Sequence, residues 1–214
     1  MTPIHHLLTL WNPSYAADAM DEHLRVLLDW AGRWRRKEAE ADDVYVWWGR
    51  IRSPNRKGAL PHAQEIASID AQIQEGTETH LYLTDYRSLY VAHLGEITAD
   101  HLPENAPGEL DHMPDYYRSQ FADFWFRLWD VRRLVADDTP AVIEELRSLT
   151  NTRYHQRPVS LYGGMVDLPL LVTRPDEVSW FGDRDFLTDG HLWAERESEL
   201  KGQTERTGRE TAVC

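Results

Sequence analysis

The chain has 214 residues, of which 42% are hydrophobic, and a formal net charge of −13, a charge that disfavours indiscriminate attraction to a polyanion. Its length suffices for one large domain with its own core. No apolar run approaches the roughly 20 residues of a membrane span, and the one cysteine is the last residue, so we expect a cytoplasmic protein with no membrane contact and no disulfide framework.

The first part of the chain alternates strand and helix patterns. Residues 4–10 form an apolar run that predicts a strand, and Pro13 stops it because proline cannot donate to a strand ladder. Apolar residues spaced three and four apart predict a helix over 18–37. The β-branched and aromatic run 44–51 predicts a second strand, and the segment 61–74 begins with proline and predicts a second helix.

The second part begins with a hairpin pattern. Residues 80–84 and 89–97 are apolar runs joined by a polar turn over 85–88. Residues 98–115 are rich in Pro, Asp, Glu and Gly, which indicates a long surface loop. The remaining predicted elements are a strand over 121–134, a short helix over 140–149 and strands over 159–162 and 168–173.

This order of elements favours an α+β fold, with helices packed on a curved mixed sheet. We expect residues 1–194 to form a single domain with elaborations, and the strands 44–51, 80–84 and 89–97 to share one sheet that curves towards a barrel. The segment 195–214 reads as a charged flexible tail, because its charges are balanced and few of its residues are apolar.

Motifs of known catalytic chemistry are absent from the sequence. Gly163-Gly164 stands without the further glycines or lysine of a phosphate-binding loop, and no HExxH pattern occurs. Arg87 and His93 have the spacing of the HEPN ribonuclease pair, but they fall in a predicted hairpin instead of a helix. The acidic, histidine-containing segments 100–104 and 111–115 fit turn chemistry as well as a metal site. We therefore expect no enzymatic activity, no cofactor and no bound metal.

Tryptophan and the basic residues are distributed unevenly along the sequence. The chain contains nine tryptophans, and Trp47 and Trp48 are adjacent in a predicted strand, so their side chains must face opposite ways. We expect one of them in the core and the other against a ligand that stacks on aromatic rings. Between Arg33 and Lys57 lie eight basic residues against four acidic ones, which makes this window the expected contact with nucleic acid.

Three segments resemble the PUA-like superfamily, which includes the EVE, YTH and ASCH domains. They are LLTLWNPSY, VWWGRIRS and LYLTDYRSLYVAHLGEI, and the resemblance spans about residues 4–135. It implies a PUA-like pseudo-barrel that takes a modified base of DNA or RNA into an aromatic cage. Such domains often serve as the specificity module of a restriction, phage-defence or RNA-processing system, so an associated nuclease or helicase subunit is an expected partner.

The resemblance also suggests roles for individual residues. The implied stacking walls are Trp11 and Trp48, with Tyr82 and Tyr86 as second choices. The implied hydrogen-bonding groups for the base edge are Asn12 and Asp85, and the implied phosphate contacts are Arg50, Arg52, Arg56 and Lys57. Each residue also has a structural interpretation: Trp48 as core, Asn12 and Asp85 as turn formers, and the basic residues as solubilising charge.

Two other functions are compatible with the same residues. The acidic charge and the aromatic surface are also typical of a protein-interaction module, such as an antitoxin-like or assembly subunit that binds a basic partner. A small-molecule sensor that uses the same pocket is the third hypothesis.

The composition of the tail leads to a first prediction. Deletion of residues 198–214 should leave the melting temperature nearly unchanged, because the segment has few apolar groups to offset the entropy of ordering it. Thermal unfolding of the full and shortened chains checks this. A fall of many degrees would show that the tail packs on the domain.

Overall fold

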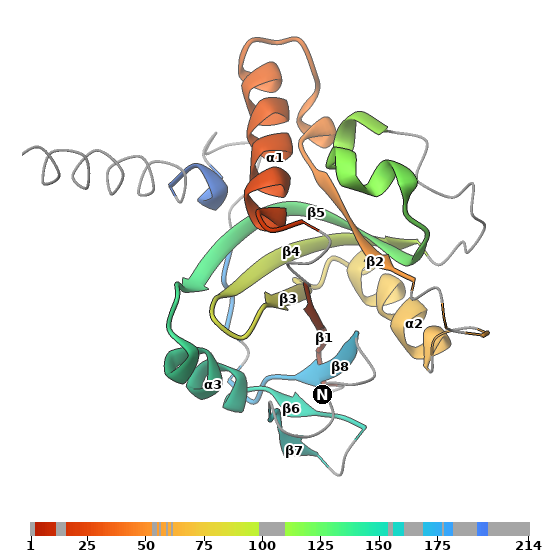
Figure 1. The fold of residues 1–214 in the computed structure, drawn as a ribbon, viewed down its shortest axis with the longest axis vertical. Coiled ribbons are helices and arrows are strands. Elements are labelled where there is room, and N and C mark those ends of the chain that lie inside the picture. Colours follow the sequence, from red (N-terminus) through yellow and green to blue (C-terminus); the bar gives the residue numbers. More distant parts are fainter. Residues whose placement is uncertain are drawn as a thin grey trace, which may run out of the picture.

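A computed structural model describes residues 3–11, 16–52, 55, 57–58, 60, 62–98, 110–153, 156–160, 169–176, 178–181 and 192–196. These residues form a mixed α+β fold around one eight-stranded sheet (Figure 1). In Figure 1, β4 and β5 are long curved strands at the centre, with α1 and α3 on opposite sides of them.

Most elements follow the predicted order with small shifts at their ends, but the short strands β6 and β7 were not predicted, and among the described residues no strand of the sheet begins at residue 159 as predicted. The strands are β1 (His5–Leu10), β2 (Val46–Ile51), β3 (His80–Thr84), β4 (Leu89–Thr98), β5 (Ala122–Val135), β6 (Thr150–Asn151), β7 (Arg157–Pro158) and β8 (Leu170–Thr173). The helices are α1 (Ala19–Arg35), α2 (Ala63–Gln74) and α3 (Thr139–Arg147), with the 3-10 helices η1 (Ala41–Asp43), η2 (Leu110–His112) and η3 (Asp115–Ser119).

The predicted common sheet is confirmed, and so is the hairpin. The strand order is β2-β5-β4-β3-β1-β8-β6-β7, with β5 between β2 and the β3–β4 hairpin. β1 and β3 are parallel, so their carboxyl ends meet at the same edge of the sheet. Among the described strands, β2 and β7 end an open sheet. Closure into a pseudo-barrel therefore stays a prediction.

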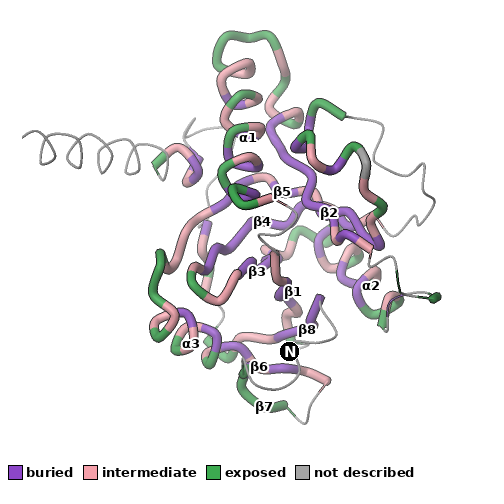
Figure 2. Tube along the Cα trace, viewed as in Figure 1, coloured by how far each residue is buried: buried purple, intermediate pink, exposed green. Residues whose placement is uncertain are grey.

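One face of the sheet carries the main core. Helix α1 contributes Leu24, Leu27 and Ala31, and α2 contributes three isoleucines at helical spacing. These side chains pack on the alternate strand residues that point to this face, which include Trp48. Figure 2 shows the central strands as almost continuously buried. Burial of apolar area of this kind is the main favourable term in folding.

The opposite face carries two further clusters. One lies under α3 and β8, and the other packs Trp47 and Trp125 against Met113 and Tyr117 from the segment that contains η2 and η3. Trp47 and Trp48 are each only 3% exposed. The expectation that one of them leaves the core is thus wrong, because residues 110–119, which we predicted to be partly surface loop, cover the second face.

A stack of rings holds the 3-10 segment against α1. The His112 imidazole lies between Trp30 and Tyr45, with ring centroids 3.9 Å away on each side. The guanidinium groups of Arg33 and Arg127 lie over the outer faces of Trp30 and Tyr45, at 4.5 and 3.9 Å. Each cation–π contact contributes roughly 0.5 to 2 kcal/mol, so the stack fixes η2 between the helix and the sheet.

Several predicted segments lie partly outside the described residues. The parts outside are most of the loop 98–115, the last two residues of the strand predicted at 159–162, the first residue of the helix 61–74 and of the strand 168–173, and the tail from 197 onward. Of the predicted tail, the described residues are Glu195 and Arg196, and Glu195 forms an ion pair with Arg35 of α1. No helix in the described part of the chain is both long and apolar enough to cross a membrane.

Three histidines lie side by side across neighbouring strands. His6 of β1 stacks on His80 of β3 with ring centroids 4.5 Å apart, and His80 is the register partner of His93 of β4. His93 is in turn the register partner of Asp130 of β5. A row of ionisable groups therefore crosses four adjacent strands, and Phe181 covers it by stacking on His93.

Two carboxylates of this region hold the C-terminal segments. Glu78 accepts hydrogen bonds from the backbone of Trp180 at 2.9 Å and from the Ser179 hydroxyl at 2.5 Å. Asp130 accepts hydrogen bonds from the backbone N–H groups of Trp193 at 2.8 Å and Ala194 at 3.1 Å. The segments 178–181 and 192–196 are thus attached to the sheet through buried or half-buried acids.

This row predicts loss of stability in acid. Burial lowers the pKa of His6 to about 3 and that of His93 to about 4, below the unfolded value near 6.5. Burial raises the pKa of Asp130 to about 7, so its protonation acts in the opposite direction. Burial also lowers the pKa of His23 of α1 to about 4. Between pH 6.5 and 4.5 the unfolded chain therefore gains three histidine protons that the folded chain does not bind, and the folded chain holds one extra carboxyl proton. The free energy of unfolding should fall by about 2.7 kcal/mol per pH unit.

Urea unfolding at several pH values between 7.5 and 4.5 checks this expectation. Asp130→Asn removes the opposing carboxyl, so it should make the fall with acid about one and a half times as steep. Asp137→Asn is the matched control, because its side chain is 77% exposed and ion-paired at the surface with Arg87. A free energy of unfolding that stays flat down to pH 4.5 would contradict the assignment.

Candidate functional site

A pocket of about 50 Å³ lies where the end of β1 meets β2, the start of α1 and η3. It brings together the two tryptophans that were predicted as stacking walls and one predicted phosphate contact. The lining residues are Leu10, Trp11, Ala16, Ala19, Trp48, Gly49, Arg50, Ile51, Tyr116 and Tyr117.

Trp11 forms the wall at the end of β1. Its backbone N–H donates to the Thr84 carbonyl at 3.1 Å, which holds it beside the end of the parallel strand β3. Its ring meets Tyr90 edge-on at 5.8 Å, and its side chain is half-buried. Trp11 thus ends the strand with one part packed on the core and another part facing the pocket.

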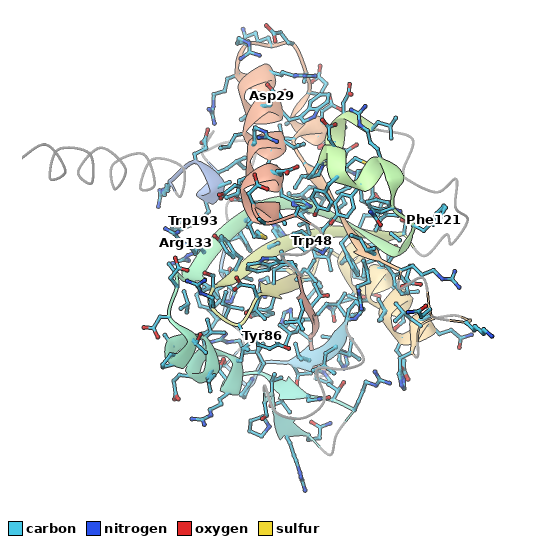
Figure 3. The ribbon with its side chains drawn as sticks, in the orientation of Figure 1. Asp29, Trp48, Tyr86, Phe121, Arg133 and Trp193 are labelled. Carbon is cyan, nitrogen blue, oxygen red and sulfur yellow. The ribbon has the colours of Figure 1, made fainter. Side chains whose placement is uncertain are left out.

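Trp48 is both a wall of the pocket and part of the core. It belongs to the main core cluster, and the His23 imidazole of α1 lies 4.3 Å from its ring. Figure 3 shows Trp48 between α1 and the sheet. Burial lowers the pKa of His23 to about 4, so this histidine is neutral near pH 7. The back of the pocket is therefore uncharged and firmly packed.

Gly49 has no side chain, so aromatic rings can pack closely against β2 on the face opposite Trp48. A Cβ at this position would lie 2.7 Å from the Trp125 ring and 3.0 Å from the Tyr117 ring, closer than packed atoms tolerate. The Tyr117 hydroxyl donates to the Gly49 carbonyl at 3.2 Å. The glycine of the VWWGR segment is thus required for the close approach of these two aromatic rings.

Tyr116 and Tyr117 were not among the predicted site residues. They lie on η3 with ring centroids 4.2 Å apart, and both contact the ring of His23. Burial raises the pKa of each hydroxyl, so both remain protonated at neutral pH. The adjacent tyrosines just before the strand at 121–134 were the available signal, but only the folding of η3 over β2 brings them to Trp48.

Of the predicted phosphate contacts, Arg50 lines the pocket and two others follow it along the chain. Arg50 donates to the Ile51 carbonyl at 3.1 Å, and Arg52 donates to the Gly58 carbonyl at 3.2 Å. Lys57 is exposed in the same loop. The end of β2 and this loop therefore form a basic margin beside the pocket.

Three predicted ligand contacts lie away from the pocket. Tyr82 is fully buried in the cluster on the opposite face, where its hydroxyl accepts from Trp180 Nε1 at 3.0 Å. Asp85 Oδ1 accepts the backbone N–H groups of Arg87 and Ser88, so this carboxylate shapes the hairpin turn. Tyr86 packs beside the same cluster as Tyr82, below Trp48 in Figure 3.

Two predicted site residues, Asn12 and Arg56, lie outside the described residues. Within the part of the chain that the structure describes, no group of three or more His, Cys, Asp or Glu side chains is placed to hold a metal ion. His112, from one of the two acidic segments considered as metal sites, is instead the centre of the aromatic stack.

Comparison with known proteins identifies the family. A family model described as Pua-like matches residues 34–155, which include β2 to β6 and most of the pocket walls. No curated protein and no solved structure matches the chain. The match covers more than half of the sequence and contains Trp48, Arg50 and both tyrosines of η3. The chain therefore belongs to the Pua-like family.

Proposed function

We propose that this chain is a non-enzymatic reader of a modified base in DNA or RNA. The Pua-like domain suggests nucleic-acid binding at the level of the superfamily. The observation that carries the finer proposal is the pocket in which Trp11 and Trp48 meet Tyr116 and Tyr117 beside a basic margin. Aromatic rings stack on any base, and nearby basic groups hold the phosphate backbone.

The size of the pocket limits how a base is bound. At about 50 Å³ it is far smaller than the roughly 300 to 1,000 Å³ of ordinary small-molecule sites. A base must therefore widen it or insert only its modified edge. Trp48 and Tyr117 are buried, whereas Trp11 and Tyr116 are half-buried, so a base edge would meet Trp11 and Tyr116 first. This size favours a reader of one base edge over a sensor that encloses a small molecule.

A recognition role of this kind needs a partner that acts on the bound nucleic acid. The domain would position a nuclease or helicase subunit of a restriction, phage-defence or RNA-processing system. The pseudo-barrel expected from the resemblance would close around the same aromatic cage.

A protein-interaction module is the second candidate, and one observation favours it. Phe121 is 56% exposed, at the edge of the molecule in Figure 3, and its carbonyl accepts from the Arg52 N–H. An exposed aromatic residue on a rigid strand end is also a suitable contact for a protein partner. If the protein shows no preference for modified oligonucleotides, the protein-interaction module becomes the favoured function.

Substitution of Trp11 tests the stacking wall. Trp11→Ala should weaken binding of a modified oligonucleotide by roughly 5- to 150-fold, since a stacked base contributes about 1 to 3 kcal/mol. Fluorescence anisotropy with modified and unmodified oligonucleotides measures this. Trp34→Ala is the matched control, because Trp34 is also half-buried against the main core but lies about four helical turns from the pocket. Equal binding by both variants and the natural chain would show that Trp11 is not a stacking wall.

Trp48→Ala should behave differently from Trp11→Ala. Because Trp48 is part of the core, its loss should lower the free energy of unfolding by about 3 to 5 kcal/mol as well as abolishing binding. Urea unfolding of the two variants separates these effects. A Trp48→Ala protein as stable as the natural chain would show that the ring contributes little to the core.

The basic margin predicts an effect of salt. Arg52→Ala and Lys57→Ala should each weaken binding to all sequences alike, and should reduce the slope of log affinity against log salt by about 1. Arg147→Ala is the control, because Arg147 is an exposed arginine on α3 paired with Glu144. Titrations at 50 and 200 mM salt provide the comparison. If the slope of log affinity against log salt is unchanged in both variants, Arg52 and Lys57 do not contact the phosphate backbone.

A further inference from the structure

Acidic residues lie next to the walls of the pocket on the side away from the basic margin. Asp18 occupies the N-cap position of α1 between the lining residues Ala16 and Ala19, and its side chain makes no capping hydrogen bond. Glu22 follows one turn later. Asp115 immediately precedes Tyr116 on η3. Three carboxylates thus lie next to the lining residues of the pocket, from two elements, and Asp115 forms an ion pair with Arg118 at 2.8 Å.

Glu22 is the most confined of the three. Its side chain is 18% exposed, and Arg25, the one cation paired with it among the described residues, stands 3.9 Å away with a largely exposed side chain. Burial and the neighbouring Asp18 and Asp115 raise the pKa of Glu22. A helix N-terminus favours acids and by itself would lower that pKa, so the shift shows that burial and crowding of like charges dominate.

The field of these carboxylates reaches the pocket wall. Burial raises the pKa of Tyr116, and Glu22 and Asp18 add to the shift. The faces of tryptophan and tyrosine rings attract cations, and a carboxylate beside such rings strengthens that attraction. A positively charged base edge in the pocket would relieve the repulsion between the acids and also contact the half-buried rings of Trp11 and Tyr116.

The charges at the pocket are separated in the way that a nucleotide with a cationic base requires. Arg50 and Arg52 lie at the β2 end, where Arg50 donates to the Ile51 carbonyl and Arg52 donates to the Gly58 carbonyl of the loop. Arg52 also lies 4.0 Å from the Asp123 carboxylate, so Arg52 is partly neutralised. The carboxylates lie at the α1 and η3 end. An anionic phosphate fits the first end, and a positively charged base fits the second.

We infer that the pocket selects a base that carries a positive charge, such as adenine methylated at N1, guanine at N7 or cytosine at N3, over neutral modified bases. The selection follows from four aromatic rings bordered by Asp18, Glu22 and Asp115. This inference rests on the proposed reader function and names the class of base that it reads.

The test is a binding panel on one oligonucleotide sequence. It contains 1-methyladenine, 7-methylguanine and 3-methylcytosine as cationic bases, N6-methyladenine and 5-methylcytosine as neutral ones, the unmodified strand, and a trimethyllysine peptide. Cationic bases should bind roughly tenfold more tightly than neutral ones. Tighter binding of a neutral modified base overturns this inference but supports the reader. No preference for any modified strand refutes the reader itself, and preference for the peptide refutes nucleic acid as the partner.

Variants of the acids locate the effect. Glu22→Gln keeps the shape of the side chain, and it should cost roughly tenfold in affinity for the cationic base and less than about twofold for the neutral one. Asp115→Asn, whose side chain is 83% exposed and so not needed for folding, should show a smaller loss of the same kind. Asp21→Asn is the control for net charge, because Asp21 is exposed in the same first turn. Equal losses for both classes of base in Glu22→Gln would overturn the inference.

Discussion

The site depends on the alternation of side chains along β2. Trp47 and Trp48 are neighbours, so the pleat sends two large rings to opposite faces, and both faces must then be covered. Helix α1 covers one face, and the segment with η2 and η3 covers the other. Because Gly49 has no side chain, Tyr117 approaches the strand closely. The pocket forms where these two covers meet at the end of β1.

Local sequence patterns predicted most of the fold. Apolar periodicity located α1, α2 and the central strands, since each signal is contained within one element. The structure brings Trp11 and Trp48 to one pocket, and a strand end and a two-faced strand can be recognised locally. Tyr116 was missed because its place depends on how a distant loop folds. Tyr82, a second-choice wall, lies on the opposite face, and its face depends on its register with β1, which local patterns do not show.

The acidity of the chain argued against nucleic acid when only its sum was known. In the structure, Asp18 and Glu22 at the start of α1 and Asp115 on η3 lie next to lining residues of the pocket, and Arg50 and Arg52 lie at the end of β2, where Asp123 faces Arg52. Asp130 is a buried acid that holds backbone donors far from this surface. The formal charge of −13 is a sum over acids that hold the fold together and acids near the pocket. The charges next to the pocket, and not this sum, determine which ligands it attracts.

The segment that the family model matches is shorter than the part of the chain that packs together, as the two carboxylates that hold the C-terminal segments show. The family match ends at residue 155, yet Glu78 and Asp130 inside it accept hydrogen bonds from residues 179–194 outside it. β1 also precedes the match and lies between β3 and β8. A fragment cut to the matched residues would expose a sheet edge and remove most of the hydrogen-bond donors of Glu78 and Asp130. The smallest autonomous folding unit is therefore longer than the segment by which the family is recognised.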